Sequence, residues 1–463
     1  MDRFIDRKEE LGFLEDQYKS SSASFIVIYG RRRVGKTTLI QEFAKRKPLI
    51  YYLASEESEQ QNIKAFKDSI AEFTGDALLG SASVDNWDIL FNTLAERLPE
   101  QRLVLVIDEF QYLGKANKAF PSILQRAWEM HLKDKNIMLI ICGSLISLME
   151  EQALVSSSPL YGRRTGQIRL QQIDFIHYHE FFTGLSYKEL IEYYAVTGGV
   201  PKYIEQFNGD GSLLAKIEQQ ILNKRSLLYE EPTFLLSNEV SETGSYFSII
   251  KSIATGNRRI GKISADLGIK LTNLPKYLKT LTDLGLIERV IPVTEKNPEK
   301  NKMGLYQITD NFISFWFKFV YPERSRLELN ESRHVVQQIS DRLIDSHVSF
   351  VYESICQGEL WQLVNQGLYD INKVGSWWDR QTQIDVVGIN NSGNEIIFGE
   401  CKFQKRLMDI DVFMALLEKK ERVIWNRDNR VEKFVLFSIS GYTKRLRALA
   451  ESRDDLLLFE RSV

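Results

Sequence analysis

Cysteine is scarce in this chain of 463 residues, which contains only Cys142, Cys356 and Cys401. An odd and scattered set of this kind forms neither a disulfide framework nor a CxxC metal site. The sequence also lacks the run of about 20 apolar residues that a transmembrane helix needs. Its N-terminus alternates charged and apolar residues and has no apolar signal-peptide core. These absences exclude a disulfide-rich secreted class and predict a cytoplasmic protein with no membrane partner.

An excess of charge of either sign is absent as well. The chain has 60 lysine and arginine residues against 62 aspartate and glutamate residues, which gives a formal net charge of −2. Any site for a polyanion must therefore be local. The five histidines show no zinc-type pairing with cysteine, so no metal chemistry is assigned to them. The composition, 43% hydrophobic and 26% charged, is typical of a globular protein.

Up to about Leu170, short β-rich apolar runs alternate with longer amphipathic stretches. This rhythm predicts an α/β fold whose parallel sheet is covered by helices. The predicted strands are FIVIY at 25–29, LIYYLA at 49–54, LVLVI at 103–107, IMLIIC at 137–142 and IRL at 168–170. Helical patterns then continue to about Leu236, broken at Gly198-Gly199 and Pro201, and predict an all-helical appendage.

A phosphate-binding motif follows the first predicted strand. Gly30-x4-Gly35-Lys36-Thr37 stands at a strand-to-helix turn, as a P-loop requires. The loop N–H groups and the positive end of the next helix would cradle phosphate oxygens of ATP. Lys36 would reach the β- and γ-phosphates, and Thr37 would ligate Mg²⁺. The residues predicted to contact the nucleotide are Gly30, Arg31, Arg32, Arg33, Val34, Gly35, Lys36, Thr37 and Thr38.

Further candidate catalytic residues follow three later strands. Asp108 is placed to hold Mg²⁺ through water, and Glu109 to orient and polarise the water that attacks the γ-phosphate. Ser144 would either sense the γ-phosphate or cap the following helix. One of Arg163 and Arg164 is predicted to act as an arginine finger, in cis or from another subunit, and an ordinary solvated pair is the alternative.

The chain resembles the archaeal-type ATPase family of AAA+-related P-loop proteins, close to the STAND NTPases, over about residues 1–330. The likeness rests on FIDRKEELGFLE (4–15), GRRRVGKTT (30–38), VIDEFQYL (106–113), ICGSLISLM (141–149), LYGRRTG (160–166) and TGGVPKYI (197–204). It implies ATP binding, with Arg7 near the base of the site and Pro201, in the Gly198–Pro201 turn, near the nucleotide at a lid. Family members are switches as often as motors.

The stretch from Ser245 to Thr309 predicts three short helices and a β-wing, the pattern of a winged helix. Between Thr255 and Lys302 it carries ten lysine and arginine residues against five acidic ones. Its second helix could enter a major groove of DNA. The residues expected on or near that helix are Lys270, Thr272, Asn273, Lys276 and Lys279. DNA contact and a structural or partner-docking role both stay open.

A β-hairpin is predicted near the C-terminus, where QIDVVGI and IIFGECKF flank the turn NNSGN. Centring the turn on Ser392-Gly393 places Asp385 directly opposite Glu400, and strand alternation puts Lys402 on the same face. Opposed carboxylates repel unless a cation lies between them, so Asp385 and Glu400 are predicted to bind Mg²⁺ or Mn²⁺. Lys402 would position the attacking water or stabilise phosphate charge, and Glu353 would either complete the metal shell or be an ordinary solvated residue.

This arrangement resembles the PD-(D/E)xK nuclease superfamily over roughly residues 335–463. The stretch VGSWWDRQTQIDVV…IIFGECKF is similar to a domain of unknown function often fused behind the archaeal-type ATPase. Ile384 stands where the superfamily's proline would be. Three interpretations of the domain stay open: an active nuclease, an inactivated relative that binds nucleic acid, and a charged structural hairpin.

The predicted organisation has five parts: a P-loop ATPase core (1–195), a helical lid (196–240), a winged helix (241–321), a linker (322–334) and an α/β restriction-endonuclease-like domain (335–463). The leading hypothesis is an ATPase whose nucleotide state controls DNA binding and metal-dependent phosphodiester cleavage. One alternative is a regulatory ATPase whose C-terminal domain only docks DNA or protein, and another is a signalling NTPase that forms homo-oligomers.

Overall fold

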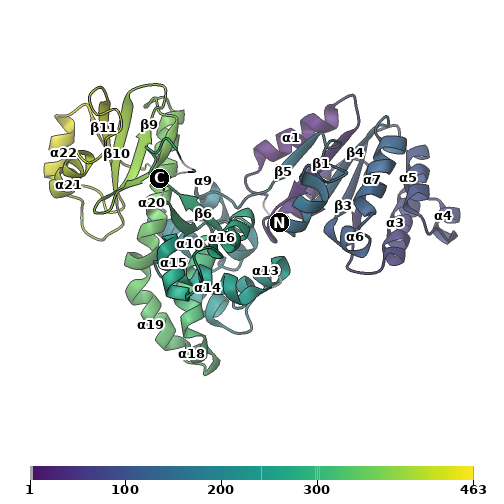
Figure 1. The fold of residues 1–463 in the computed structure, drawn as a ribbon, viewed down its shortest axis with the longest axis horizontal. Coiled ribbons are helices and arrows are strands. Elements are labelled where there is room, and N and C mark those ends of the chain that lie inside the picture. Colours follow the sequence, from purple (N-terminus) through teal and green to yellow (C-terminus); the bar gives the residue numbers. More distant parts are fainter. Residues whose placement is uncertain (1–3, 241, 298, 300, 302, 462–463) are drawn as a thin grey trace. The chain divides into compact units, whose positions relative to one another are not determined.

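The computed structural model describes residues 4–240, 242–297, 299, 301 and 303–461. The chain separates into two compact units (Figure 1). The N-terminal unit comprises Met1–His177 with Val200–Glu205 and Leu235–Ser241, and the C-terminal unit comprises the remainder. No helix in the described part of the chain is both long and apolar enough to cross a bilayer.

The N-terminal unit is built on a five-stranded parallel sheet in the order β2-β3-β4-β1-β5. Its strands are β1 (Ser24–Tyr29), β2 (Leu49–Leu53), β3 (Leu103–Asp108), β4 (Ile137–Gly143) and β5 (Gly166–Arg169). Every residue of β1, β3 and β4 is buried, which explains their continuous apolar runs. The predicted parallel sheet is confirmed, and each predicted strand overlaps an observed one.

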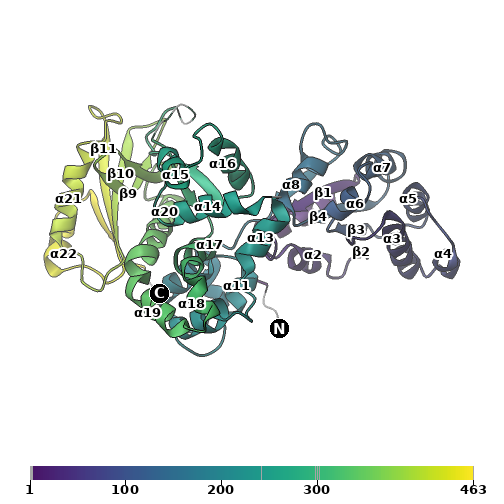
Figure 2. The ribbon, with the colours of Figure 1, turned by 60° about the horizontal axis from the view of Figure 1, so that its bottom comes forward.

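Helices cover both faces of this sheet (Figure 2). Leu14 of α1 and Leu39 and Phe43 of α2 join one apolar core with the inner strands, whereas the opposite face packs Phe25 against Trp128 with ring centroids 5.2 Å apart. The helices of this unit include α1 (Lys8–Lys19), α2 (Lys36–Ala44), α3 (Glu59–Thr74), α5 (Trp87–Glu96), α6 (Gln111–Ala116), α7 (Phe120–Ala127), α8 (Ile146–Met149) and α11 (Pro201–Glu205).

Gly30 ends β1 with φ near 153°, and a Cβ built there would lie 2.4 Å from the Leu170 carbonyl oxygen. We expect Gly30→Ala to lower the free energy of unfolding by about 2 kcal/mol and to weaken ATP binding, because a backbone carbonyl cannot move aside cheaply. Gly12 on α1 has open space around it, so Gly12→Ala should stabilise by about 0.5–1 kcal/mol. The melting temperatures of both variants and of the wild type, measured by thermal unfolding, compare the two effects on stability. Equal melting temperatures would contradict the proposed clash.

The C-terminal unit begins with helices that precede a basic middle segment. The helices α10 (Tyr187–Thr197) and α12 (Leu213–Ile217) lie in the region predicted to be helical, and α10 starts with a capping box formed by Ser186 and Glu189. The middle segment, residues 243–308, contains α14 (Thr243–Ala254), α15 (Ile260–Leu267) and α16 (Leu274–Asp283), then the antiparallel pair β6 (Ile287–Val290) and β7 (Leu305–Ile308). Three helices followed by a two-stranded sheet is the predicted order of elements.

A mixed five-stranded sheet, in the order β12-β11-β10-β9-β8, ends the chain. Its strands are β8 (Lys373–Trp378), β9 (Gln383–Ile389), β10 (Glu395–Lys402), β11 (Val431–Ser438) and β12 (Leu456–Phe459). The sheet lies between α20 (Ser349–Asn365) on one side and α21 (Ile410–Lys420) with α22 (Lys444–Glu451) on the other (Figure 1). The sequence did not predict β12.

The linker predicted at 322–334 is mostly helical instead. A 3₁₀ turn (Tyr321–Glu323), α18 (Arg324–Glu328) and the start of α19 (Ser332–Leu343) occupy it. Only Leu327 is buried there, so the segment lacks the apolar periodicity that would have indicated helices.

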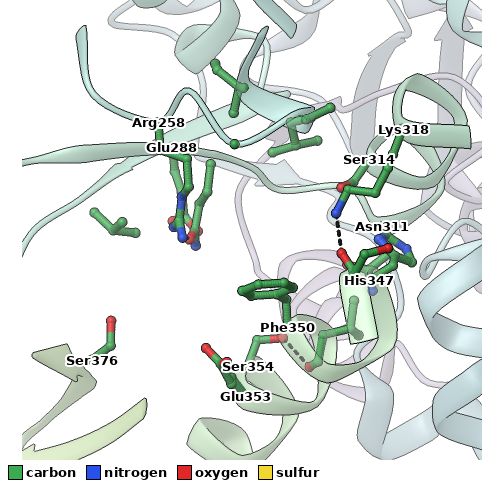
Figure 3. A pocket seen from close by; sticks show the side chains of 18 of the residues that line it. Arg258, Glu288, Asn311, Ser314, Lys318, His347, Phe350, Glu353, Ser354 and Ser376 are labelled. Atoms are coloured by element: carbon green, nitrogen blue, oxygen red, sulfur yellow. Dashed lines mark hydrogen bonds between the residues drawn. The ribbon is translucent and has the colours of Figure 1, made fainter. Parts of the chain in front are cut away.

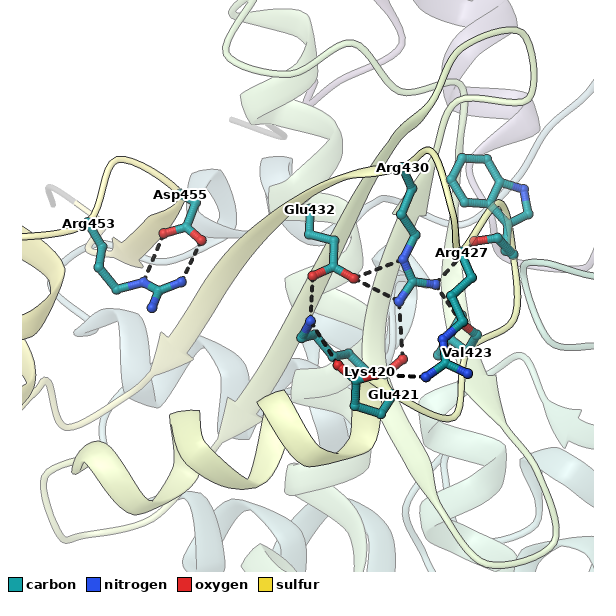
Figure 4. Close-up of polar contacts among 9 residues, drawn as sticks. Lys420, Glu421, Val423, Arg427, Arg430, Glu432, Arg453 and Asp455 are labelled. Atoms are coloured by element: carbon teal, nitrogen blue, oxygen red, sulfur yellow. Dashed lines mark hydrogen bonds and ion pairs between the residues drawn. The ribbon is translucent and has the colours of Figure 1, made fainter.

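A buried arginine fixes the end of α21 against the sheet (Figure 4). The Arg430 side chain, 3% exposed, pairs with Glu432 and donates to the carbonyls of Val423, Trp425 and Lys420. Lys420 also donates to the Glu432 carboxylate at 2.6 Å. The Lys420 carbonyl is at the C-terminus of α21, and Val423 and Trp425 lie in the loop that follows it, so these bonds connect the end of the helix and that loop to β11.

Candidate functional site

The turn from β1 to α2 has the geometry of an anion-binding loop. Gly35, with φ near 97°, stands at the N-cap of α2, and Arg33 also has a positive φ. The Lys36 ammonium is buried and donates to the carbonyls of Gly30 at 2.8 Å and Arg31 at 2.9 Å. Burial lowers the pKa of Lys36. The backbone N–H groups at the N-terminus of α2 therefore lie beside the desolvated Lys36 ammonium. This arrangement is suited to binding phosphate.

The other predicted loop residues differ in exposure. Arg31 and Val34 are buried, whereas Arg32 and Thr38 are exposed. Arg7 is buried, and its guanidinium group donates to the carbonyl oxygens of Val34 and Gln171. It therefore lies next to the phosphate loop, the region in which the family resemblance places it.

Asp108 and Thr37 meet at the carboxyl end of the sheet. The Thr37 hydroxyl donates to Asp108 Oδ2 at 3.4 Å, and the Tyr51 hydroxyl donates to the same oxygen. Burial, followed by the hydrogen bond to Asp108, raises the pKa of Tyr51. Asp108 therefore has an oriented carboxylate next to the phosphate loop, as a Mg²⁺ site would need.

Glu109 is held by two neighbours. It adopts a positive φ of 51°, and its Oε2 accepts from Ser144 Oγ at 2.9 Å and from Gln111 Nε2 at 2.5 Å. The N-cap of α8 is Leu145, so the alternative in which Ser144 caps this helix is wrong. Ser144 instead directly follows β4, and its hydroxyl donates to Glu109, the predicted catalytic carboxylate.

Arg163 and Arg164 each contact other residues of their own unit. Arg163 Nε donates to Glu129 at 3.1 Å. Arg164 donates to the carbonyls of Ala153 and Leu154 and lies over the Tyr161 ring. Both side chains are partly exposed, and each guanidinium group is engaged within the N-terminal unit. The arginine-finger role and the solvated-pair alternative both stay predictions.

The C-terminal hairpin has the predicted register. β9 and β10 pair Ile389 with Ile396 and Val386 with Gly399, and one further residue in the same register places Asp385 opposite Glu400. Both acids are buried. Cys401 N–H donates to Asp385 Oδ2 at 3.1 Å. Burial, and then the charge of Glu400, raises the pKa of Asp385 to about 6.

Two lysines neutralise Glu400. Lys402 donates to Glu400 Oε1 at 2.8 Å, and Lys419 of α21 contacts both carboxylate oxygens at 2.8–2.9 Å. Burial alone would lower the pKa of Lys402, but the charge of Glu400, the hydrogen bond to it and the charge of Asp385 act together to raise it. Lys419, which the sequence did not indicate, arrives through the packing of α21 on the sheet.

The predicted third metal ligand, Glu353, is not assembled with the other two. Within the described ranges, no three His, Cys, Asp or Glu side chains are placed to hold one metal ion. Burial, and then the charge of Asp385, raises the pKa of Glu353 to about 8. Glu353 therefore keeps its proton at neutral pH and is a neutral neighbour of Asp385 in this structure.

Comparison with known proteins identifies the N-terminal unit. Residues 4–207 match a family described as an ATPase domain predominantly from Archaea. An uncharacterized protein of Methanocaldococcus jannaschii is 36% identical over 411 residues, which cover 88% of this chain and 89% of that protein. The chain belongs to the archaeal-type ATPase family. A shorter uncharacterized ATP-binding protein of the same organism is 52% identical over 46 residues, 10% of this chain and 78% of that protein.

The structure of the Walker-type ATPase of Pyrococcus abyssi shares the fold of this archaeal-type ATPase. It has a TM-score of 0.50 and 21% identity, and the match covers 68% of this chain and 96% of that one. Residues 316–422 match a second family, described as "Archaea bacterial proteins of unknown function". That range includes Asp385, Glu400 and Lys402.

Sequence reasoning did not select three residues that lie at the candidate nucleotide site of this archaeal-type ATPase: Tyr51, Gln111 and Glu239. Glu239 ends α13 (Glu231–Glu239), accepts from Ile146 N at 3.1 Å, and has a pKa raised by burial. Gln111 stands two residues after Glu109 in DEFQ, and this short spacing was the sequence signal that could have indicated its place at the site. Pro201 is the first residue of α11, whose residues cluster with the N-terminal unit.

Proposed function

We propose that this ATPase couples its nucleotide state to DNA binding and to metal-dependent cleavage of phosphodiester bonds. ATP and Mg²⁺ would bind at the loop of residues 30–38, with Lys36 on the phosphates and Thr37 and Asp108 toward the metal. Glu109, oriented by Ser144, would polarise the attacking water. The cleavage half of the proposal is supported by the β9–β10 register, which pairs Val386 with Gly399 and, extended by one residue, would oppose Asp385 and Glu400.

The donor set of the C-terminal site suits a small hard cation. Mg²⁺ commonly takes one or two protein carboxylates and keeps several waters, and Mn²⁺ accepts the same oxygen ligands. Asp385 and Glu400 are the residues that would hold it. Bound metal would activate water, while Lys402 would stabilise charge on the phosphate. A cation would also relieve the repulsion that raises the pKa of Asp385.

The exposed surface of the middle segment supports DNA binding. Lys270, Lys276 and Lys279, on or just before α16, are all exposed, as are Thr272 and Asn273. These are the positions expected to face a major groove in a winged helix.

One observation favours a second function, a non-catalytic docking domain. Glu400 is already paired with both Lys402 and Lys419, so its charge is balanced without metal. In that case the domain would bind DNA or protein and leave phosphodiester bonds intact. DNA binding that needs no metal and yields no product would favour it.

Glu109→Gln tests the coupling. The amide keeps the shape of the side chain but cannot take a proton, so we expect ATP turnover to fall about a hundredfold while ATP still binds. Cleavage of linear, circular and single-stranded DNA is measured in Mg²⁺ or Mn²⁺ with wild type and variant, each with ATP, ADP or no nucleotide. If the nucleotide state controls the nuclease, the Glu109→Gln variant with bound ATP and the wild type with ADP should cleave DNA at different rates.

Identical cleavage in all nucleotide states would contradict coupling while leaving the nuclease intact. Absence of any product on every substrate, with ATP still hydrolysed, would contradict the nuclease.

A further inference from the structure

The C-terminal unit contains a cavity of about 890 Å³ that is separate from the P-loop and shares Glu353 with the candidate cleavage site (Figure 3). Its walls come from the middle segment at Arg258 and Glu288, from the helical turns that carry Ser314 and Lys318, from α20 at Phe350, and from β8. Cavities of 300–1,000 Å³ are typical of small-molecule sites. A mononucleotide or dinucleotide fits this size, and a DNA duplex does not.

Five lysine and arginine residues line this cavity, and three of them, Arg258, Lys318 and Arg342, interact with one another. Lys318 donates to the Ser346 carbonyl, and Arg258 donates to the Gln307 side chain and to the Tyr306 carbonyl. Burial, and then the positive charges of Arg342 and Arg258, lower the pKa of Lys318 to about 8. The charge of Glu288 stabilises Arg258, and a bound anion would do the same for Lys318 and Arg342.

The charged side chains that line the cavity have a net positive charge. Among the described lining residues, five are lysine or arginine and three are glutamate. His347 adds no charge at pH 7, because burial and the Lys318 charge lower its pKa to about 4.

An aromatic ring stands beside the cations. Phe350 lines the cavity with 54% of its surface exposed, and Lys318 Nζ lies 5.6 Å from the centre of its ring. An exposed phenylalanine beside the Lys318 ammonium would provide a stacking surface for a base next to a phosphate site.

We propose that this cavity binds a nucleotide through its phosphate, which contacts Lys318 and Arg342, and its base, which stacks on Phe350. The bound group is a phosphate ester of a nucleoside, supplied either as a free mono- or dinucleotide or as the 5′-end of a single strand. This site is separate from the P-loop, and its occupation requires neither ATP hydrolysis nor cleavage.

The test uses full-length protein carrying Lys36→Ala, so that the P-loop lysine no longer contributes to nucleotide binding, in buffer without divalent metal. Calorimetry measures binding of adenosine monophosphate, a 5′-phosphorylated dinucleotide and a 5′-phosphorylated ten-nucleotide strand. We expect at least one probe to bind. Adding Arg342→Gln should weaken it about tenfold or more, because a charge-assisted hydrogen bond is lost.

Arg342 is exposed, so its replacement should not disturb folding, and Lys318→Met and Phe350→Ala provide independent variants. Lys444→Gln, an exposed lysine on α22 outside the cavity, is the matched control and should leave the affinity unchanged. Binding of the small probes identifies a free nucleotide as the ligand, and binding of the strand alone identifies a strand end. The proposal is overturned if no probe binds, or if binding is indifferent to Arg342→Gln, Lys318→Met and Phe350→Ala.

Because metal and the P-loop lysine are both absent from this assay, its outcome is independent of ATP turnover and of DNA cleavage. If no nucleotide binds in the cavity, the proposed ATPase and nuclease functions are unaffected. If those functions fail their tests, the proposed nucleotide site in the cavity is unaffected.

Discussion

Replacing Lys36 by alanine is expected to reduce ATP hydrolysis by about a thousandfold. The Lys36 ammonium lies inside the loop, held by the Gly30 and Arg31 carbonyls, and is the desolvated cation closest to the position that the loop offers to phosphate. A fixed charge in a water-poor site stabilises developing phosphate charge far more than a solvated one does. Steady-state phosphate release from wild type and variant measures the effect.

Lys45→Ala is the matched control for this variant. Lys45 directly follows α2, is exposed, and pairs only at the surface with Glu42 at 2.5 Å. We expect its turnover to equal that of wild type. If Lys36→Ala hydrolyses ATP at the wild-type rate while folded, the phosphate site lies elsewhere.

Lys402→Ala is expected to reduce DNA cleavage at least about a hundredfold and to leave ATP turnover unchanged. Lys402 contacts Glu400, and its ammonium would stabilise charge on a phosphate bound beside Glu400 and Asp385. Lys419 still neutralises Glu400 in this variant, so folding should be preserved. Product formation on labelled DNA with Mg²⁺ or Mn²⁺ measures the loss.

Two further lysines sharpen this test. Lys405→Ala removes an exposed lysine three residues away and should cleave as wild type does. Lys419→Ala removes the charge that competes with metal for Glu400 and should lower the Mn²⁺ concentration needed for cleavage. Cleavage that survives Lys402→Ala would mean that the active site is misassigned.

The parts of the fold that could be predicted were those specified locally. The inner strands of the first sheet are apolar on both faces, so their sequence runs are continuous. The hairpin register followed from the NNSGN turn, because the numbering on each side of a tight turn fixes which residues oppose one another. In both cases the signal lies within a few neighbouring residues.

The missed residues come from helices whose position depends on tertiary packing. Lys419 stands 19 residues beyond Glu400 and reaches it only because α21 folds back on the sheet. Glu239 approaches the nucleotide site from α13 in the same way. The short charged helix α18 has one buried side chain, Leu327, and too little apolar pattern to be distinguished from a loop.

Glu400 and Lys402 lie on β10, which pairs with β11 along its whole length, with Glu400 beside Leu436 and Lys402 beside Ser438. Its pairing with β9 covers Ile396 to Gly399, directly before the site. A strand in the middle of a sheet opens only when much of the domain opens. The backbone that carries this site therefore cannot serve as its switch. Any on-off control of the chemistry must be exerted by side chains arriving from the flanking helices, and Lys419 and Glu353 are the two that approach the acids from α21 and α20.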